Sequence, residues 1–364
     1  MATSYDDISG VLRRNNRGVV SYPNSPFGAT DPKGAQKAMI PIDLDGADHH
    51  LYRKLLDPYF SPAAIAKLEP KVRAVAAGLI DEFIEAGRCD FVPQFSFPFP
   101  GSTVMGLMGW PLEDGPMMAD WVDILLHGVR GATEDESNAA RVAVMGQVNE
   151  YFLGQIELRR RSPSDDITTL MLNVEVEGQQ LSNEQLYDCF VLMMMAGLDT
   201  VNSVLAQSFV YLSRHQDLWS QMFESPDTLG RGVEEFIRWG APAVPTRTVA
   251  DEGFMVRDVE IPVGERVHCP LGAANRDPKY YPDPDEIRLD RELKPHLAFG
   301  LGPHRCIGSH LARMEMRVAF EELHRRIPAF GLDESQPPQD HLGLAWGTEN
   351  VHILFTPGNR DSAS

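Results

Sequence analysis

Cysteine is rare in this chain, since its 364 residues contain only four. Cys89, Cys189, Cys269 and Cys306 lie far apart and form no CxxC pair. This spacing argues against a disulfide framework and against a zinc ribbon. Isolated cysteines are typical of a reducing compartment, and we therefore expect a cytoplasmic protein.

Long apolar runs are also missing. The longest run extends from Cys189 to Leu198, where Asp199 ends it, and is too short to cross a bilayer. The first ten residues, MATSYDDISG, lack the apolar segment of a secretory signal. The sequence thus predicts neither a membrane span nor export.

Positive charge is in short supply. Lys and Arg number 33 against 52 Asp and Glu, which gives a formal net charge of −19. Binding of nucleic acid needs a concentrated basic surface, so the composition argues against that class of function. The chain also lacks repeats, low-complexity stretches and Pro/Gly/Ser-rich linkers. We expect one domain over residues 1–364.

Helical patterns dominate the sequence. The clearest begins with a capping box of Ser182 and Gln185, and apolar residues follow from Leu186 to about Leu212. Its middle is apolar nearly all round, which predicts a helix buried through the centre of the molecule. Further helices are expected at 63–86, 227–239 and 308–327, strands between 244 and 270, and coil over 276–296. The predicted fold class is mainly α with a small β region late in the chain.

One segment around Cys306 carries an ordered set of residues directly before a helix. It reads Phe299-Gly-Leu-Gly302-Pro-His304-Arg-Cys306-Ile-Gly308. If Cys306 binds iron, the glycines let the backbone turn and pass close to a flat macrocycle. The positive end of the following helix then stabilises the thiolate. A thiolate pushes electron density onto a haem iron and favours cleavage of an O–O bond.

Three other interpretations of Cys306 compete at this point. A lone cysteine among apolar neighbours is often a buried structural residue. A glycine-rich turn before a helix can hold a dinucleotide, but Arg305 stands where GxGxxG needs its third glycine. A zinc site of His304, Cys306 and His310 matches neither the HExxH spacing nor the paired-cysteine spacing.

The pattern FxxGxHxCxG resembles the haem-binding loop of the cytochrome P-450 family. The resemblance implies a cytochrome P-450 fold, in which haem b lies between the long central helix and the cysteine loop. It implies Cys306 as the iron ligand, with Phe299 beside the sulfur and Gly302 and Gly308 in the binding loop. The position of His304 is implied to bind a haem propionate.

A second motif of the family precedes the cysteine loop, as the family requires. Glu235 and Arg238 form a Glu-x-x-Arg pair, whose i,i+3 spacing places both residues on one helix face. In relatives an arginine from the coil before the cysteine joins them. Glu286 occupies the usual position here, which leaves Arg288 and Arg291 as candidates for the third partner.

A third motif lies in the middle of the central helix, as Ala196-Gly197-Leu198-Asp199-Thr200. An acid and a hydroxyl at the core of such a helix are costly unless they have partners. By resemblance, Thr200 lies over the distal face of the haem, Asp199 relays protons, and Gly197 lets the helix deform to admit dioxygen. The alternative is a helix threonine that bonds back to its own backbone.

The resemblance extends to the rim and the distal side of the haem. A carboxylate-bearing group in an apolar pocket needs cations at its rim, and His49, Arg53 and Arg247 are implied to contact the propionates. Residues implied to line the substrate pocket are Leu192, Met195, Ala196, Ala243 and Val244. The first residues of the chain match the family's early second helix, so the family's initial helix and strands are expected to be absent.

The implied activity is monooxygenation, in which one oxygen atom of O2 enters a C–H bond of a small hydrophobic substrate. The Gly-Leu-Asp-Thr-Val form of the central helix is similar to the bacterial camphor-hydroxylating branch, which suggests a terpenoid. Electrons are expected from a ferredoxin and its reductase, with docking on a cationic face of Arg53, Lys54, Lys71, Arg73 and Arg305. A peroxide-driven enzyme and a non-catalytic or truncated haem protein are the alternatives.

Overall fold

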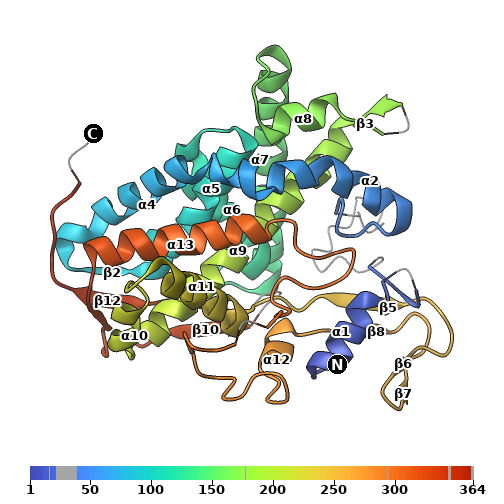
Figure 1. Ribbon diagram of the computed structural model, residues 1–364. Coiled ribbons are helices and arrows are strands. Elements are labelled where there is room, and N and C mark those ends of the chain that lie inside the picture. Colours follow the sequence, from blue (N-terminus) through green and yellow to red (C-terminus); the bar gives the residue numbers. More distant parts are fainter. Residues whose placement is uncertain (16, 22–38, 177, 293, 343–345, 362–364) are drawn as a thin grey trace.

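The computed structural model describes residues 1–15, 17–21, 39–176, 178–292, 294–342 and 346–361. Helices form most of the molecule (Figure 1). They are α1 Tyr5–Arg13, α2 Gly46–Leu56, α3 Pro62–Ala66, α4 Glu69–Phe83, α5 Pro98–Met108, α6 Gly115–His127, α7 Glu134–Arg161, α8 Ile167–Asn173, α9 Asn183–Ser213, α10 Gln216–Gln221, α11 Pro226–Gly240, α12 Leu271–Asn275 and α13 Ser309–Arg326. The predicted fold class, mainly α with a small β region, is confirmed.

The strands are short and form small antiparallel sheets. They are β1 Val19–Val20, β2 Arg88–Asp90, β3 Glu175–Val176, β4 Gln179–Gln180, β5 Thr246–Val249, β6 Met255–Val256, β7 Val259–Glu260, β8 Arg266–His268, β9 Phe330–Leu332, β10 Gln339–Leu342, β11 Trp346–Asn350 and β12 His352–Phe355. Two sheets have three strands each, in the orders β1-β5-β8 and β2-β12-β9. The pairs β3-β4, β6-β7 and β10-β11 complete the set in the described part of the chain.

The central helix α9 begins as the sequence predicts. The Ser182 hydroxyl accepts a hydrogen bond from the backbone N–H of Gln185 at 3.2 Å, and the Gln185 side chain accepts one from the backbone N–H of Ser182 at 2.9 Å. This reciprocal capping box satisfies two N–H groups that the first turn leaves free. By length and composition α9 is apolar enough to cross a membrane, but 72% of its apolar window is buried inside the molecule.

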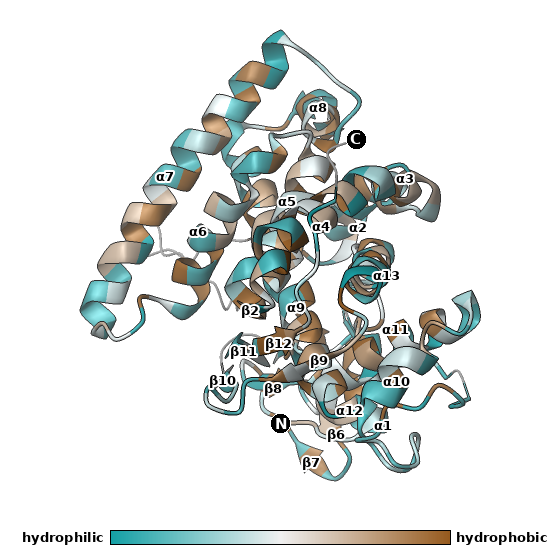
Figure 2. Cartoon of the chain, turned by 90° about the vertical axis from the view of Figure 1, so that its left-hand side faces the viewer, coloured by the Kyte–Doolittle hydropathy of each residue, from teal (hydrophilic) through white to brown (hydrophobic). Residues whose placement is uncertain are grey.

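Helix α9 is the axis of the core. It contacts α5, α6, α7, α11 and α13 as well as β11. Figure 2 shows α9 in the middle of the molecule, while α7 runs along an outer edge. A continuous apolar cluster includes Phe91, Phe95, Phe99 and Phe209, whose rings stack in succession. The buried helix that the sequence predicts is therefore the element around which the others pack.

The predicted helix over 63–86 differs from the structure, because it is divided into α3 and α4. Pro70 lies in the first turn of α4, where its missing N–H costs nothing. Ser61 caps α3 by accepting a hydrogen bond from the backbone N–H of Ala64. The β region also differs in place, since the early strands β1 and β2 pair with β5 and β12. The sequence interpretation had located strands only late in the chain.

Candidate functional site

The loop before α13 is closed by its own backbone. The N–H of Cys306 donates to the carbonyl of Phe299 at 2.8 Å, and the N–H of Arg305 donates to the carbonyl of Gly302 at 3.1 Å. Gly300 and Gly302 have φ angles of +67° and +76°, which side chains other than glycine rarely adopt. A Cβ atom on Gly302 would also lie only 2.6 Å from the carbonyl oxygen of Leu12. These turns agree with the role that the sequence assigned to the glycines.

Cys306 presents an accessible sulfur at the end of this loop. Its side chain is reached by solvent, whereas Cys89, Cys189 and Cys269 are buried. Surrounding protein atoms raise the pKa of the Cys306 thiol, and the backbone N–H of Gly308 and the charges of Arg53 and Arg305 act in the opposite direction. Helix α13 starts directly afterwards, at Ser309, so its positive end also favours a thiolate.

A group of buried basic side chains lies beside the cysteine loop. Arg247 on β5 is 7% exposed; its Nη1 donates to the carbonyl of Thr246, while its Nε has no hydrogen-bond partner in the described part of the chain. His49 on α2 is 4% exposed, and its ring centroid lies 4.0 Å from that of His304. Burial, followed by the charges of His304 and Arg53, lowers the pKa of His49 to about 4. The structure thus brings together three of the residues predicted to contact the propionates.

Two of the predicted propionate contacts already have protein partners. His304 Nε2 lies 3.0 Å from Asp45 Oδ1 and 3.1 Å from the hydroxyl of Ser21. Arg53 Nη1 donates to the carbonyl of Arg305 at 2.7 Å, and its Nε pairs with Asp57 at 3.0 Å. Arg53 therefore joins α2 to the backbone of the cysteine loop. The sequence does not predict Asp45 as part of the site, because nothing in its local pattern relates it to a histidine 259 positions away.

The Glu-x-x-Arg pair forms a buried cluster with a third member. Arg238 Nε donates to Glu235 Oε1 at 2.8 Å and Arg238 Nη2 donates to Oε2 at 3.0 Å. Arg291 Nε donates to Glu235 Oε2 at 2.9 Å, whereas Arg288 contributes only its backbone N–H, at 3.1 Å. Arg238 and Arg291 both also donate to the backbone carbonyl of Glu286. Arg291 is therefore the third partner that the sequence left open.

The middle of α9 combines buried and accessible positions. Leu192, Ala196 and Thr200 are four residues apart and share one helix face, on which Ala196 is exposed and the other two are partly exposed. The Thr200 hydroxyl donates to the carbonyl of Ala196 at 3.0 Å, which is the backbone bond that the alternative interpretation expects. Met195 is 6% exposed and packs into the core. An accessible apolar stripe thus interrupts an otherwise buried helix.

Asp199 and Gly197 lie on other faces of the same turn. Asp199 is 2% exposed, and its Oδ1 lies 3.6 Å from Nε2 of His127 on α6. A Cβ atom on Gly197 would lie 2.6 Å from a methyl group of Val104 on α5. Helix α9 is continuous through Gly197, so the structure gives this glycine a packing role instead of the expected local deformation. Ala243 and Val244, predicted to line a pocket, lie before β5, and Val244 is 37% exposed.

Known proteins are similar to this chain over most of its length. The family model described as "Cytochrome P450" matches residues 116–355. This chain belongs to the cytochrome P450 family. A probable cytochrome P450 127A1 from Sinorhizobium fredii is 34% identical over 88% of this chain and 76% of its own. A steroid C26-monooxygenase from Mycolicibacterium smegmatis is 29% identical over 87% of this chain and 79% of its own.

Solved cytochrome P450 structures agree with the fold. Bacillus megaterium CYP109E1, in complex with corticosterone, has a TM-score of 0.85 and 26% sequence identity, over 97% of this chain and 91% of its own. The cytochrome P450 fold predicted from the cysteine loop is therefore confirmed. Because its relatives are bacterial and include named monooxygenases, this P450 is a bacterial-type monooxygenase.

Membership of the family implies a haem cofactor, and the chemistry of the cysteine site fits one. The sulfur of Cys306 is accessible and receives an N–H from the start of a helix. Arg247 holds a buried guanidinium whose Nε is unpaired among the described residues, as a site for a carboxylate would require. No group of three His, Cys, Asp or Glu side chains that could bind a metal occurs in the described ranges, which leaves the zinc interpretation without support.

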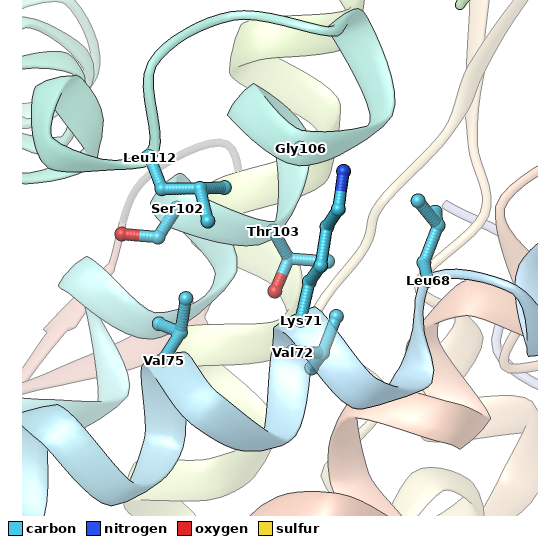
Figure 3. Close-up of a pocket in the computed structure, with 8 residues that line it drawn as sticks. All are labelled: Leu68, Lys71, Val72, Val75, Ser102, Thr103, Gly106 and Leu112. Atoms are coloured by element: carbon cyan, nitrogen blue, oxygen red, sulfur yellow. The ribbon is translucent and has the colours of Figure 1, made fainter. Parts of the chain in front are cut away.

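A hollow between α4 and α5 lies apart from these residues (Figure 3). Val72, Val75 and Leu112 line it, and the aliphatic chain of Lys71 lies across it. It encloses about 10 Å³, which is the room of a single water molecule. This P450 therefore has no room for an organic substrate at that place.

Proposed function

We propose that this chain is a haem-thiolate monooxygenase that binds haem b through Cys306 and inserts one oxygen atom of O2 into a C–H bond. The observation that carries the proposal is the accessible Cys306 sulfur before α13, together with the buried guanidinium of Arg247, whose charge acts on His304 of the same loop. The bound haem supplies the activation of dioxygen, and the protein supplies its ligand, its orientation and its protons.

The residues around the cysteine loop bind different parts of the cofactor or hold the loop in place. Cys306 binds the iron, and the turns at Gly302 and Gly308 with the ring of Phe299 keep the loop close to it. The side chains that bind the propionates are the cations of Arg53 and Arg247 and the imidazole N–H groups of His49 and His304. The cluster of Glu235, Arg238 and Arg291 fixes the coil before the loop, because three charged side chains and several carbonyls are satisfied there together.

On α9, Asp199 and Thr200 deliver protons to the distal side, and Gly197 keeps the helix close to α5. The apolar stripe of Leu192 and Ala196 lines the substrate pocket together with Ala243 and Val244, and Met195 packs in the core behind this lining. Such a lining favours a neutral hydrophobic molecule over a charged one. Two similar P450s are named for, or solved with, steroids, so we propose a compact polycyclic isoprenoid, either a terpenoid or a steroid.

The absorption spectrum of the reduced, carbon-monoxide-bound protein tests the ligand. We expect the strongly red-shifted Soret band of thiolate ligation in the wild type and in the matched variant Cys89→Ala, and its loss in Cys306→His. A wild-type spectrum without this band would overturn the proposal. Product formation with peroxide but not with O2 and reductant would replace it by the peroxide-driven alternative.

Difference spectra during titration with ligands test the substrate class. We expect saturable spectral shifts with testosterone or a bicyclic monoterpene and none with a long-chain fatty acid of similar size. Saturable binding of the fatty acid alone would contradict the neutral polycyclic substrate. We place this monooxygenase in the cytoplasm and its electron supply in a separate ferredoxin and ferredoxin reductase.

A further inference from the structure

The buried carboxylate of Asp199 lies close to a histidine, His127, on the neighbouring helix α6. His127 is the last residue of α6, and its Nε2 lies 3.6 Å from Asp199 Oδ1. The side chain of His127 is 18% exposed and that of Asp199 is 3% exposed. Within the described residues, Asp199 Oδ1 accepts no hydrogen bond. A partly exposed, titratable ring therefore stands between solvent and a buried carboxylate.

The charges around His127 favour its protonated form. Burial opposes the charge, but Asp199, then Asp123 on α6 and Glu349 on β11, raise the pKa of His127 above its usual value. Arg141 on α7 lies against Gly128 and pairs with Glu134 at 2.9 Å. Helix α5, which also packs on α6, carries no charged residue. Three acids therefore raise the pKa of the ring, while the guanidinium of Arg141 is paired with Glu134.

Thr200 does not compete for this carboxylate. Its hydroxyl donates to the carbonyl of Ala196, and successive residues of a helix point about 100° apart. The side chain of Asp199 thus points toward α6, and the side chain of Thr200, the next residue, points in another direction. This arrangement gives the carboxylate of Asp199 a titratable neighbour in His127 and leaves Thr200 on the partly exposed face of α9.

We propose that His127 is the residue through which protons enter this P450 and reach Asp199. In the step, the imidazolium of His127 gives its Nε2 proton to the carboxylate of Asp199, and the neutral ring takes a proton from water at its exposed edge. No electron moves and no other bond changes. The inference rests on the proposed monooxygenase function, because it supplies the protons that the reduction of dioxygen consumes.

The contact itself can be tested without turnover. The titration of His127 is followed by NMR of histidine nitrogens in the reduced, carbon-monoxide-bound protein, which is diamagnetic, and the signal is assigned by its loss in His127→Gln. We expect the pKa of His127 to fall in Asp199→Asn, because the variant removes the charge 3.6 Å away. An unchanged titration in Asp199→Asn would overturn the proposal.

Proton delivery is then measured as the share of consumed O2 that is released as peroxide across a pH series. In the wild type this share rises as pH increases through the pKa of His127. In His127→Gln we expect it to be high and nearly pH-independent, with proton-dependent turnover reduced by about 10-fold or more. His352→Gln is the matched control, because it removes a similar contact, 3.8 Å from Asp90, in the sheet of β2 and β12.

The outcomes separate this inference from the proposed function. A His127→Gln protein with the red-shifted Soret band and a wild-type pH profile would leave the monooxygenase intact and overturn the proton entry at His127. Loss of the Soret band in the wild type would instead remove the proposed function. A larger solvent deuterium isotope effect in His127→Gln than in His352→Gln supports the relay, which a purely structural contact would not produce.

Discussion

At the scale of single residues, two buried glutamates have pKa values that are shifted in opposite directions. Burial disfavours the charge of Glu235, but Arg238 and Arg291 outweigh it and lower the pKa of this carboxyl below its usual value. Glu315 on α13 is 1% exposed, and burial raises its pKa well above the usual value, against a weaker effect of the Thr103 hydroxyl. Cationic partners, not depth, decide in which direction the pKa of each glutamate moves.

The first prediction concerns Arg291, the third member of the cluster with Glu235 and Arg238. Arg291→Met removes a cation that is 9% exposed and should reduce the free energy of unfolding by about 3 kcal/mol, the low end for a broken buried pair. Arg288→Met is the control, since the side chain of Arg288 pairs with Asp283 and Asp290 at the surface and should matter little. Urea unfolding near neutral pH measures both, and equal losses in the two variants would contradict the assignment.

The same cluster has a defined pH dependence. Since the folded pKa of Glu235 is lowered, its stabilisation is complete above the unfolded pKa of about 4.5 and is lost as pH falls through the folded value. We expect the stability difference between wild type and Arg291→Met to shrink only in that acidic range.

Glu315 gives the second prediction, with the opposite sign. A raised folded pKa means that the folded protein holds a proton on Glu315 that the unfolded chain releases more readily, so the fold loses stability as pH rises from about 4.5 through the folded pKa. The neutral amide in Glu315→Gln should therefore stabilise the protein at pH 8 by roughly 1–3 kcal/mol, since each unit by which the pKa is raised corresponds to about 1.4 kcal/mol. Urea unfolding should show this gain vanishing near pH 4, and a gain that is equal at both pH values would contradict the prediction.

At the scale of elements, the helices differed in how far the sequence could predict them. Helices α9, α11 and α13 follow their predicted ranges closely, because apolar periodicity marks all three and capping boxes start α9 and α11. Helix α7 was missed, although Val144, Val148, Phe152 and Ile156 form a buried stripe at every fourth position behind a capping box of Thr133 and Glu136. The sequence of α7 therefore contains the apolar period of a helix, but most of its residues are polar, which makes that period hard to recognise.

Pairings between distant segments could not be predicted from local pattern. The register of His352 with Asp90 joins β12 to β2 across most of the chain, and Arg291 was indistinguishable from Arg288 within one coil. Asp45 and His127 likewise gain their neighbours only through the packing of helices. Motif residues that lie close in sequence were therefore easier to place than the residues that support them.

The cysteine loop supports a third prediction, in which two glycines serve as a matched pair. Gly302→Ala places a Cβ atom 2.6 Å from the Leu12 carbonyl at a φ of +76°, whereas a Cβ atom on Gly300, at +67°, meets nothing closer than 3.9 Å. Gly300→Ala should cost only backbone strain of about 1 kcal/mol, and Gly302→Ala should cost about 2–3 kcal/mol more. Thermal unfolding and the rate of haem loss measure both, and an equal effect would show that α1 does not press on this loop.

The contact between α9 and α5 supports a fourth prediction. Gly197→Ala places a Cβ atom 2.6 Å from a methyl group of Val104 and should destabilise the protein by about 1–3 kcal/mol through overpacking. The double variant Gly197→Ala with Val104→Ala should recover part of that loss, because the second change removes the clashing methyl group. A double-mutant cycle by urea unfolding measures the recovery, and strict additivity would mean that Gly197 has another role.

At the scale of the whole molecule, charge decides how an electron donor approaches. A net charge of −19 repels an acidic partner, so docking must depend on a local group of cations. Of the face predicted from sequence, Lys54, Lys71 and Arg305 are exposed. Arg73 is different, since it bonds to Glu69, Glu321 and Glu322 at 2.6 to 2.9 Å. Its charge is neutralised within the molecule, which removes it from the proposed docking face.

The fifth prediction follows from this distribution. Reversing Lys54 and Arg305 together to glutamate should slow reduction by a ferredoxin by about 10-fold or more at low ionic strength, because steering by charge acts mainly on association. Arg214→Glu is the control, since it lies at the carboxyl end of α9, about 45 Å along that helix from Gln185, which contacts Tyr52 of α2. Stopped-flow reduction should show a salt dependence that is strong in the wild type and in Arg214→Glu and weak in the double reversal. Equal salt dependence in all three would move the docking site away from the cysteine loop, because the double reversal changes the charge at that loop and Arg214→Glu does not.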